Sequence, residues 1–464
     1  MQGEIKMFKN RSLIFITAAV FILIATNSIS AFNGSSFYGD EKTSVEVGGE
    51  FFPEYRIMTD NGDLEENIMG EINFTYPGKT HEFKFLLDFQ AGAAEEIDFD
   101  EAYYRYYGDK YHFLIGKHRL IWGTGDKVHV VDNLNPEDMS DFINREYKDR
   151  QIGEEMLKID RYFRGGNASL EFVYTPDFNG HRLADDPDSP LGNWIINPFA
   201  DKFELSDLAV ITPYTQTDII NKFENSLEGE ENQFGLRFTD SRQGVDYGFS
   251  YYKGYLREPS YNPQALKQGL DNIDLSSSIS SAEFNKILTN ADLHYDEVDI
   301  FGFELAGAAA DINSRFELAY YRTDDTSGNN PSVKNNRIAW IIGGDRDLPI
   351  NNINLNIQFK GTKILDDEQI QKNHIDYNPE GDYTSHRAIV KLKDSYSSEK
   401  IIPELTWIYN LNDNDYSLEA AVDYELQQDL HLELSHKIFN GDRETTFGQF
   451  DDNDFTSVGL RYSF

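Results

Sequence analysis

The chain has 464 residues, a formal net charge of −38 and no cysteine. The lack of cysteine excludes disulfides, thiolate metal sites, covalent haem attachment and a lipoprotein anchor. With 80 acidic and 42 basic residues, the chain is not suited to bind nucleic acid through a broad positive surface. A mean hydropathy of −0.55 excludes a helical membrane protein, but it allows a membrane β-barrel, whose strands carry apolar residues at alternate positions.

The N-terminal residues predict a secretory signal peptide over 1–31. Lys6, Lys9 and Arg11 form a basic region, an apolar run covers 13–24, and small residues at 28–31 precede the cleavage point. The alternative is a membrane anchor helix, but a span needs roughly 20 apolar residues and this run has about a dozen. We therefore expect residues 32–464 to form the mature protein as a single domain.

From there on the chain shows one strand pattern after another. Apolar and polar residues alternate, so that each strand has one apolar and one polar face. In 416–426, for example, Tyr416, Leu418 and Val422 share one face, and Glu419 and Asp423 share the other. About seventeen such segments can be recognised. They are 43–57, 69–76, 81–91, 99–107, 111–122, 168–175, 233–239, 245–254, 300–309, 314–322, 337–344, 352–360, 387–393, 403–410, 416–426, 431–438 and 455–464.

Strand length and loop length favour a membrane barrel over a soluble β-sandwich. Many segments approach the 9–11 residues of a membrane strand, whereas strands of globular proteins have roughly 5–6. Short connections, such as 311–313 and 427–429, alternate with long ones. The long ones are 176–231, 255–299, 323–336, 361–384 and 439–454. Short periplasmic turns and long extracellular loops produce this asymmetry, so we predict an all-β, antiparallel outer-membrane β-barrel. Because such barrels have even strand numbers, we expect 16–18 strands and favour 18.

The last strand has Val458, Leu460, Tyr462 and Phe464 on one face and Arg461 on the other. We expect the apolar face to contact outer-membrane lipid and Arg461 to point into the lumen. The strand should pair with the first one, near 44–55, because an open edge does not persist in lipid. A final strand that ends on Phe resembles the closing strand of bacterial outer-membrane barrels. That resemblance implies the barrel-assembly machinery as a partner, which recognises this terminus.

Residues 116–164 interrupt the strand pattern. Asn135-Pro136 places proline at a helix start with acidic residues in the first turn, which predicts a short helix to about Arg145. A glycine-flanked strand end that leads into a helical segment is unusual for a barrel. We therefore predict that about 123–164 folds into the lumen as a constriction.

The same stretch carries a resemblance to a known family. Gly-Lys-x-Arg-x-x-Trp-Gly at 116–123 and Asp-x-x-Asn-Pro-x-Asp at 132–138 resemble a segment of bacterial outer-membrane porins grouped with the alginate-export type of channel. The resemblance implies an 18-stranded passive channel with an arginine-rich lumen for a polyanion. This chain departs from that pattern because it is far more acidic.

Charged residues of this stretch and of the last strands are our candidates for the lumen. They are Lys117, Arg119, Lys127, Arg145, Arg161 and Arg164, together with Glu419, Asp423, Glu433 and Arg461. One interpretation is a local basic patch that acts as a selectivity filter, since opposed charges across a constriction select ions. The other is that these cations pair with neighbouring acids and hold the segment in place. Trp122, Asn135, Pro136 and Phe464 are the expected structural anchors.

These patterns favour a porin that lets small polar or charged solutes diffuse across the outer membrane. The alternative is a non-conducting barrel that acts as a receptor, an adhesin or a sheath for a partner protein. An enzyme is not expected, because the chain lacks a Gly-x-Ser-x-Gly elbow, a phosphate loop and paired zinc-binding histidines. Aspartate clusters at 185–188, 413–415 and 451–454 have no EF-hand spacing, so we expect no metal and no cofactor.

Overall fold

The computed structural model describes residues 45–92, 96–141, 145–184, 194, 218, 222, 227, 231–271 and 280–464. The predicted signal peptide, 1–31, lies outside the described residues.

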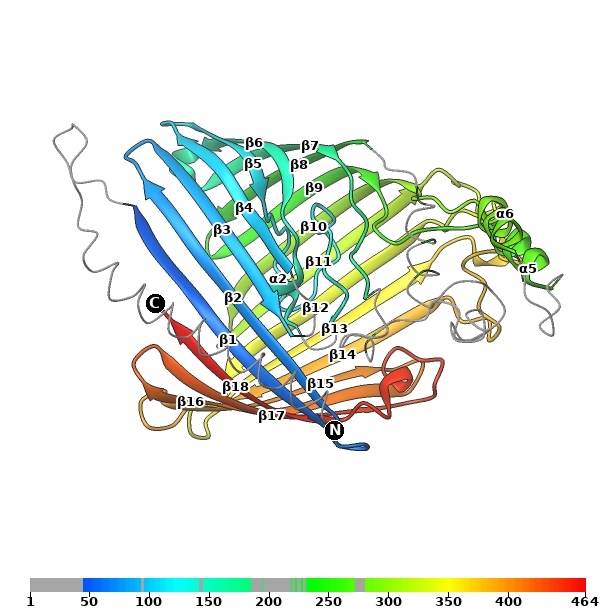
Figure 1. Ribbon diagram of the computed structural model, residues 1–464. Helices are drawn as coiled ribbons and strands as arrows, with labels where there is room; N and C mark the ends of the chain where they lie inside the picture. The colour runs from blue at the N-terminus through cyan, green and yellow to red at the C-terminus, as the bar shows by residue number, and fades with distance from the viewer. Residues whose placement is uncertain are drawn as a thin grey trace.

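Eighteen antiparallel strands form a single closed sheet, shown in Figure 1. Each strand pairs with its neighbours in the sequence, and β1 also pairs with β18. In chain order the strands are β1 (Glu46–Met58), β2 (Leu64–Pro77), β3 (His81–Ala91), β4 (Glu96–Tyr107), β5 (Tyr111–His118), β6 (Glu154–Phe163), β7 (Ala168–Asp177), β8 (Glu231–Arg242), β9 (Val245–Tyr255), β10 (Glu297–Ala309), β11 (Ile312–Thr323), β12 (Arg337–Asp347), β13 (Asn354–Ile364), β14 (Thr384–Lys393), β15 (Ile401–Asn410), β16 (Asp415–Gln427), β17 (Leu430–Asn440) and β18 (Phe455–Ser463). The predicted fold class and the favoured strand number are therefore confirmed.

The helices are short and lie between strands. They are α2 (Tyr147–Arg150), α5 (Pro263–Asp271) and α6 (Ser281–Ala291), with 3-10 turns η1 (Arg164–Gly166), η3 (Asp367–Gln369) and η4 (Gly448–Phe450). The helices α5 and α6 project from one end of the barrel in Figure 1. No helix among the described residues is long and apolar enough to cross a membrane.

Strand β6 is the one that the sequence pattern does not reveal. Glu154–Phe163 pairs with β5 on one side and β7 on the other, so the expectation that the constriction extends to residue 164 is wrong. The segment between β5 and β6 is 119–153, and we call it the inward segment. The sequence of β6 does not alternate clearly because Arg161 occupies an outward position, where its guanidinium lies 4.8 Å from the ring centre of Phe163. A cation on the apolar face hides the alternation.

The first and last strands close the barrel as expected. Glu50 lies opposite Ser463 and Tyr55 opposite Val458. Past the end of β18, Phe464 exchanges two 3.0 Å backbone hydrogen bonds with Gly49. A Cβ on Gly49 would come within 2.6 Å of the Phe464 ring, so only glycine leaves room for this aromatic end. Phe464 therefore fills a gap at the seam between the two terminal strands.

The two ends of the barrel differ in their connections. The loops that follow β7, β9, β11, β13 and β17 are long, as is the inward segment after β5. The connections at the other end, such as 243–244, 310–311 and 428–429, are tight turns. The outer face carries exposed apolar side chains at alternate positions, among them Phe249, Phe301 and Ile342. An apolar outer band and this loop asymmetry are the features of a barrel that spans a membrane.

The outward position of Leu434 allows a direct test of this topology. Replacing Leu434 with Arg should lower the free energy of unfolding by about 2–4 kcal/mol, because it places a charge on the lipid face near the middle of β17. The neighbouring substitution Ser435→Arg faces the lumen and should cost much less. Equilibrium unfolding in lipid vesicles compares the two variants. Equal losses would contradict the assigned faces.

Candidate functional site

The inward segment is held against one wall of the barrel by apolar packing. Trp122 is completely buried, and it lies in a cluster with Val130, Val131 and Leu134 of the same segment. The wall contributes apolar side chains that point into the lumen from β7, β9, β10, β11 and β12. The Trp122 indole N–H donates to Glu171 Oε1 at 2.5 Å. A Cβ on Gly235 would meet the Trp122 ring at 2.8 Å, so glycine makes room for the indole there.

A single carboxylate on β11 organises the tip of the segment. Glu317 is fully buried, and its two oxygens accept backbone N–H groups of Thr124 at 2.7 Å, Gly125 at 2.6 Å and Val130 at 2.8 Å. His129 Nδ1 lies 3.0 Å from Glu317 Oε1 and forms an ion pair when protonated. Buried backbone N–H groups that are outside a helix or a sheet still need a hydrogen-bond acceptor, and Glu317 supplies it for these residues.

Asn135 ties the two ends of the inward segment together. Its side-chain nitrogen donates to the carbonyls of His118 at 3.1 Å and Ile152 at 2.8 Å, and its oxygen accepts from the Leu120 N–H at 2.9 Å. The predicted helix from Pro136 to about Arg145 is not observed in the described part of this stretch. The Asn135 amide is engaged by other backbone groups and does not cap a helix, and the Pro136 carbonyl accepts from the Ile152 N–H. The helical turn begins later, at Tyr147.

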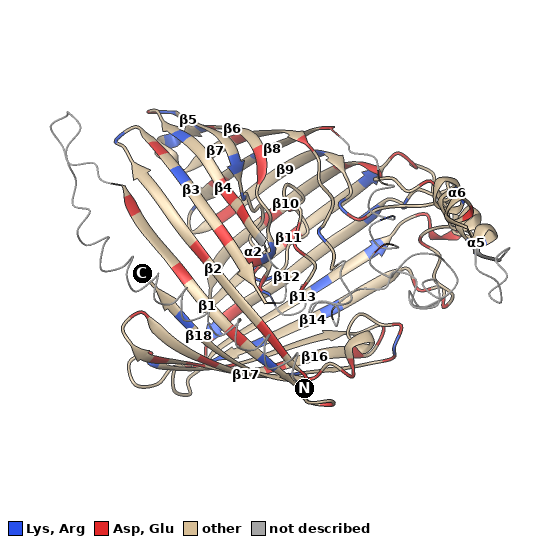
Figure 2. Ribbon diagram, in the orientation of Figure 1, with Lys and Arg blue, Asp and Glu red and all other residues tan. Residues whose placement is uncertain are grey.

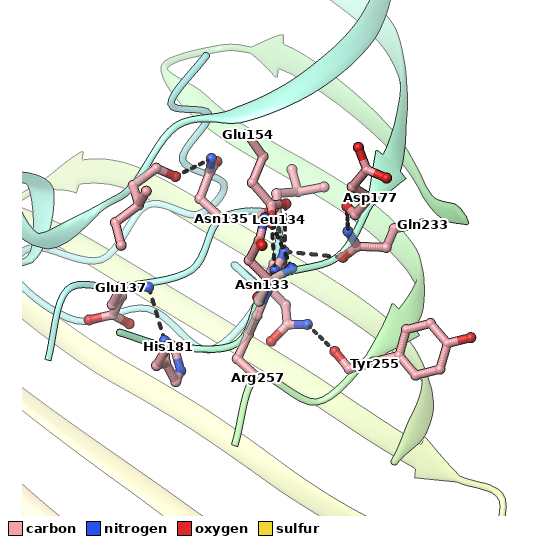
Figure 3. Close-up of polar contacts among 12 residues, drawn as sticks. Asn133, Leu134, Asn135, Glu137, Glu154, Asp177, His181, Gln233, Tyr255 and Arg257 are labelled. Atoms are coloured by element: carbon pink, nitrogen blue, oxygen red, sulfur yellow. Dashed lines mark hydrogen bonds and ion pairs between the residues drawn. The ribbon is translucent and has the colours of Figure 1, made fainter. Parts of the chain in front are cut away.

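Arg257, a buried residue of the loop after β9, binds the inward segment at Leu134 and the start of β6 at Glu154, as Figure 3 shows. Arg257 pairs with Glu154 at 2.9 Å and donates to the Leu134 carbonyl at 2.7 Å and to Gln233 Oε1 at 3.1 Å. Elsewhere in the inward segment, Asp141 pairs with Arg56 of β1 at 2.8 Å. The segment therefore crosses the lumen and is fixed on both sides.

A polar cavity of about 540 Å³ remains between the inward segment and strands β1–β4. Nine carboxylates and six cations line it. They are Glu50, Glu71, Asp88, Asp98, Asp100, Asp138, Glu146, Asp149 and Glu433, with Arg119, Arg145, Lys148, Arg150, Arg182 and Arg461. Gln90, Gln151, Phe52, Met69 and Ile152 complete the lining, together with Gly70 and Phe89, whose ring packs on Phe51 on the outer face. The charge balance of the cavity is thus negative.

The negative charge is concentrated in one row on the barrel wall. Glu50 lies directly opposite Glu71, Glu71 opposite Asp88, and Asp88 opposite Asp98. These four residues, which we call the carboxylate row, share the lumen-facing side of β1–β4. Neighbouring strands are about 4.8 Å apart, so the row extends over roughly 15 Å. Like charges directly opposite each other destabilise a sheet, so the row carries an electrostatic cost that the fold retains.

Most cations of the predicted basic patch are paired with acids. Arg119 pairs with Asp100 at 2.9 Å, Lys117 with Asp98 at 2.9 Å, Arg145 with Asp138 at 3.3 Å and Lys127 with Glu146 at 3.0 Å. Each of these pairs neutralises a positive charge. The geometry thus corresponds to the second interpretation of this stretch, in which the charges hold the segment in place.

The ten predicted lumen residues fall into two groups. Arg119, Arg145, Glu433 and Arg461 line the cavity. Asp423 lies beside it, 2.9 Å from Arg461, and Glu419 faces the lumen next to Lys437 at 3.4 Å.

The remaining four predicted residues are not part of the cavity lining. Lys117 and Lys127 form their ion pairs beside it. Arg161 points outward and stacks on Tyr111 and Phe163, so it is not a lumen residue. Arg164 lies at a tight turn, where it pairs with Asp240.

Sequence reasoning missed the carboxylate row and Gln151. Each of the four acids stands at an alternate position of its own strand, so the lumen-facing side could have been assigned from the pattern. These four acids lie in one line only because of the register of three hairpins, which the sequence pattern does not specify.

On the opposite wall, Lys360 and Arg387 are direct cross-strand partners, and Arg387 Nε donates to Asn410 at 2.6 Å. Figure 2 shows the acidic residues on β1, β2 and β4 and the basic residues on β13 and β14.

Among the ionisable groups of the inward segment whose pKa values are shifted, Asp132 and His129 lie close to its tip. Burial raises the pKa of the Asp132 carboxyl to about 6, although the charge of His129 and the hydrogen bond from the Tyr147 hydroxyl act against this shift. Burial by itself would lower the pKa of His129. The hydrogen bond and the charge of Glu317 outweigh that effect, so the pKa of the imidazole is raised.

Comparisons with known proteins show similarity in barrel architecture. No family model and no curated protein matches the chain. Among solved structures, OccK3 (OpdO) of Pseudomonas aeruginosa shares 6% identity with a TM-score of 0.49, over 91% of this chain and 96% of that one. OccAB4 of Acinetobacter baumannii shares 9% with a TM-score of 0.47, over 92% and 100%. The outer membrane channel DcaP of Acinetobacter baumannii shares 10% with a TM-score of 0.43, over 93% and 100%.

Removing the Glu317 carboxylate should release the tip of the inward segment. Glu317→Ala leaves three buried N–H groups without their acceptor, at about 1–3 kcal/mol each. We expect trypsin to cleave after Lys127 at least tenfold faster in this variant than in the parent protein. Glu419→Gln, a lumen carboxylate that does not touch the segment, is the matched control. Unchanged cleavage in Glu317→Ala would show that the apolar cluster alone holds the tip.

The Asp132 carboxyl should make the inward segment less stable as pH rises. Because its pKa is raised from 3.8 to about 6, the protonated form is favoured in the folded state. The resulting stability, about 2–3 kcal/mol, is present below pH 4 and lost as pH passes 6. His129 acts in the same direction above pH 6.5. Amide exchange in 122–134, corrected for intrinsic rates, should show this loss of protection. In Asp132→Asn the loss of protection between pH 4 and 6 should disappear. If it persists, Asp132 is not the group that titrates there.

Proposed function

We propose that this protein is an outer-membrane porin through which small polar or charged solutes diffuse. The observation that carries the proposal is the polar cavity left open beside the inward segment. A barrel that served only as a scaffold would have no need of a segment fixed across its lumen by Glu317, Asn135 and Arg257. A diffusion channel needs such a constriction, because width and charge at the narrowest point select the solute.

The charges around the cavity support a preference for cations over anions. The basic residues of the inward segment are largely paired, whereas Glu50 and Glu71 add negative charge to the wall. In a narrow passage with low-dielectric walls, one sign of charge concentrates the opposite ion. Strands β13 and β14 place Lys360 and Arg387 across the lumen, so a solute also experiences a transverse field.

The proposal extends to the cellular setting of the protein. Residues 1–31 act as a cleaved secretory signal, and the C-terminal strand ending at Phe464 is recognised by the barrel-assembly machinery. Membership of the alginate-export type of porin is supported by the motifs at 116–123 and 132–138. The acidic cavity argues against a polyanion as the solute of this particular chain. Catalysis forms no part of the proposed function.

Single-channel recording tests the proposal. Refolded protein in planar bilayers should conduct, and the reversal potential in a KCl gradient should show a preference for K⁺ over Cl⁻. Replacing Glu50 and Glu71 with Gln should reduce that preference at least twofold, because it removes negative charge from the cavity wall. Asp345→Asn, on the opposite wall and paired with Arg315 at 2.7 Å, is the control and should leave the preference unchanged. Absence of conductance would overturn the channel function.

A further inference from the structure

The cavity beside the inward segment contains features that a simple aqueous passage does not require. Among the residues that the structure describes, Asp98 is the one member of the carboxylate row with an ion pair, to Lys117 at 2.9 Å. Glu50, Glu71 and Asp88 have no cation within ion-pair distance in the described part of the chain. Arg119 lies within electrostatic range of Glu71 and Asp88, but its guanidinium pairs with Asp100. Glu50 and Glu71 therefore present negative charge to the cavity, and the Asp88 carboxyl shares a hydrogen bond with Asp100.

Gln151 provides a second, independent observation. This residue of the inward segment lines the same cavity and is only 3% exposed. Neither its amide oxygen nor its amide nitrogen has a hydrogen-bond partner among the described residues. Buried amides of this kind are nearly always paired, because leaving them unpaired costs about 1–3 kcal/mol. Two residues further along the chain, the Gly153 N–H donates to Asp100 Oδ1 at 3.2 Å, which holds this stretch against β4.

The arrangement of the acids distinguishes between kinds of cation. A bound metal ion needs ligands that converge on one point, and no group of three or more acidic or histidine side chains among the described residues does so. The carboxylates stand in a line instead, one per strand. Phe52 and Met69 lie in the same lining and offer apolar contact. Aromatic faces also attract organic cations.

We propose that the carboxylate row and Gln151 form a binding site for an organic cation that carries ammonium or guanidinium groups on an aliphatic stem. The charged ends pair with Glu71, Asp88 and their neighbours, the Gln151 amide accepts a further N–H, and the stem lies along the apolar lining. This inference rests on the proposed channel and names the class of solute that it binds during passage.

Calorimetry on the full barrel in detergent micelles tests the site without relying on transport. The titrants are putrescine, a diammonium with an aliphatic stem, uncharged 1,4-butanediol with the same stem, and CaCl₂. At about 0.1 M NaCl, charges more than roughly 10 Å apart are largely screened, so the measurement reports local contacts. We expect saturable binding of putrescine, no binding of butanediol, and Ca²⁺ affinity at least tenfold weaker than that of putrescine.

Variants locate the site. The double substitution Glu71→Gln and Asp88→Asn should weaken putrescine binding at least tenfold, and it should not impair folding because it removes repulsion within the sheet. Gln151→Leu should weaken binding severalfold. Asp345→Asn, an ion-paired lumen carboxylate on the opposite wall, should leave affinity within twofold of the parent. Heat-modifiable gel mobility checks that each barrel is folded.

Other results would overturn the site. They are the absence of putrescine binding, equal affinity for Ca²⁺ or butanediol, an equal loss in Asp345→Asn, or unchanged affinity in the Glu71 and Asp88 double variant. Unchanged affinity in Gln151→Leu would remove that amide from the site. Putrescine binding without conductance in bilayers would overturn the channel and leave the site intact, whereas conductance without binding would do the reverse.

Discussion

Backbone hydrogen bonding in lipid is the constraint on which the structure depends. The hydrocarbon region offers no partner for an unpaired N–H or C=O, so a strand-built protein must pair every edge. Here β1 and β18 meet, and the last bonds of that seam join Gly49 and Phe464. Closure then divides the side chains of each strand between lipid and lumen. All later features, including the charges inside, follow from that division.

Closure also allows the lumen to carry charges that an ordinary core would not accept. The carboxylate row arises because three short hairpins bring Glu50, Glu71, Asp88 and Asp98 to the same level. Repulsion within the row is tolerated because the rest of the strand ladder fixes the register. Function here uses an arrangement that local stability disfavours, which is common where proteins bind ligands.

The inward segment decides which part of the lumen remains open. Its apolar residues pack on strands β7–β12, and Glu317 accepts the backbone donors of its tip. This wall is therefore filled. On the other side the segment contacts β1 through the Arg56–Asp141 pair, and the cavity lies between it and β1–β4. Apolar packing closes the space between the segment and one wall. On the other wall the contacts are between charged groups, and the cavity remains open there.

Some elements could be predicted from their residues, and others could not. The last strand shows strict alternation, so its two faces and its pairing with β1 followed from sequence. Strand β6 escaped recognition because Arg161 stands on its outer face and is stabilised there by stacking on aromatic rings. The helix expected after Asn135 did not form. The Asn135 amide was engaged instead by His118 and Ile152, which are distant along the chain.

The sequence by itself determined the fold class, the closing seam and the lumen-facing identity of Glu433 and Arg461, because side-chain direction in a strand depends only on local alternation. The tertiary structure alone decided which charges are neutralised. Arg119 and Arg145 could have formed a free basic patch, but in the folded protein they meet Asp100 and Asp138. It also decided that four separate acids stand in one row beside Gln151. Both outcomes depend on hairpin register and on the path of one loop through the barrel, which no local pattern encodes.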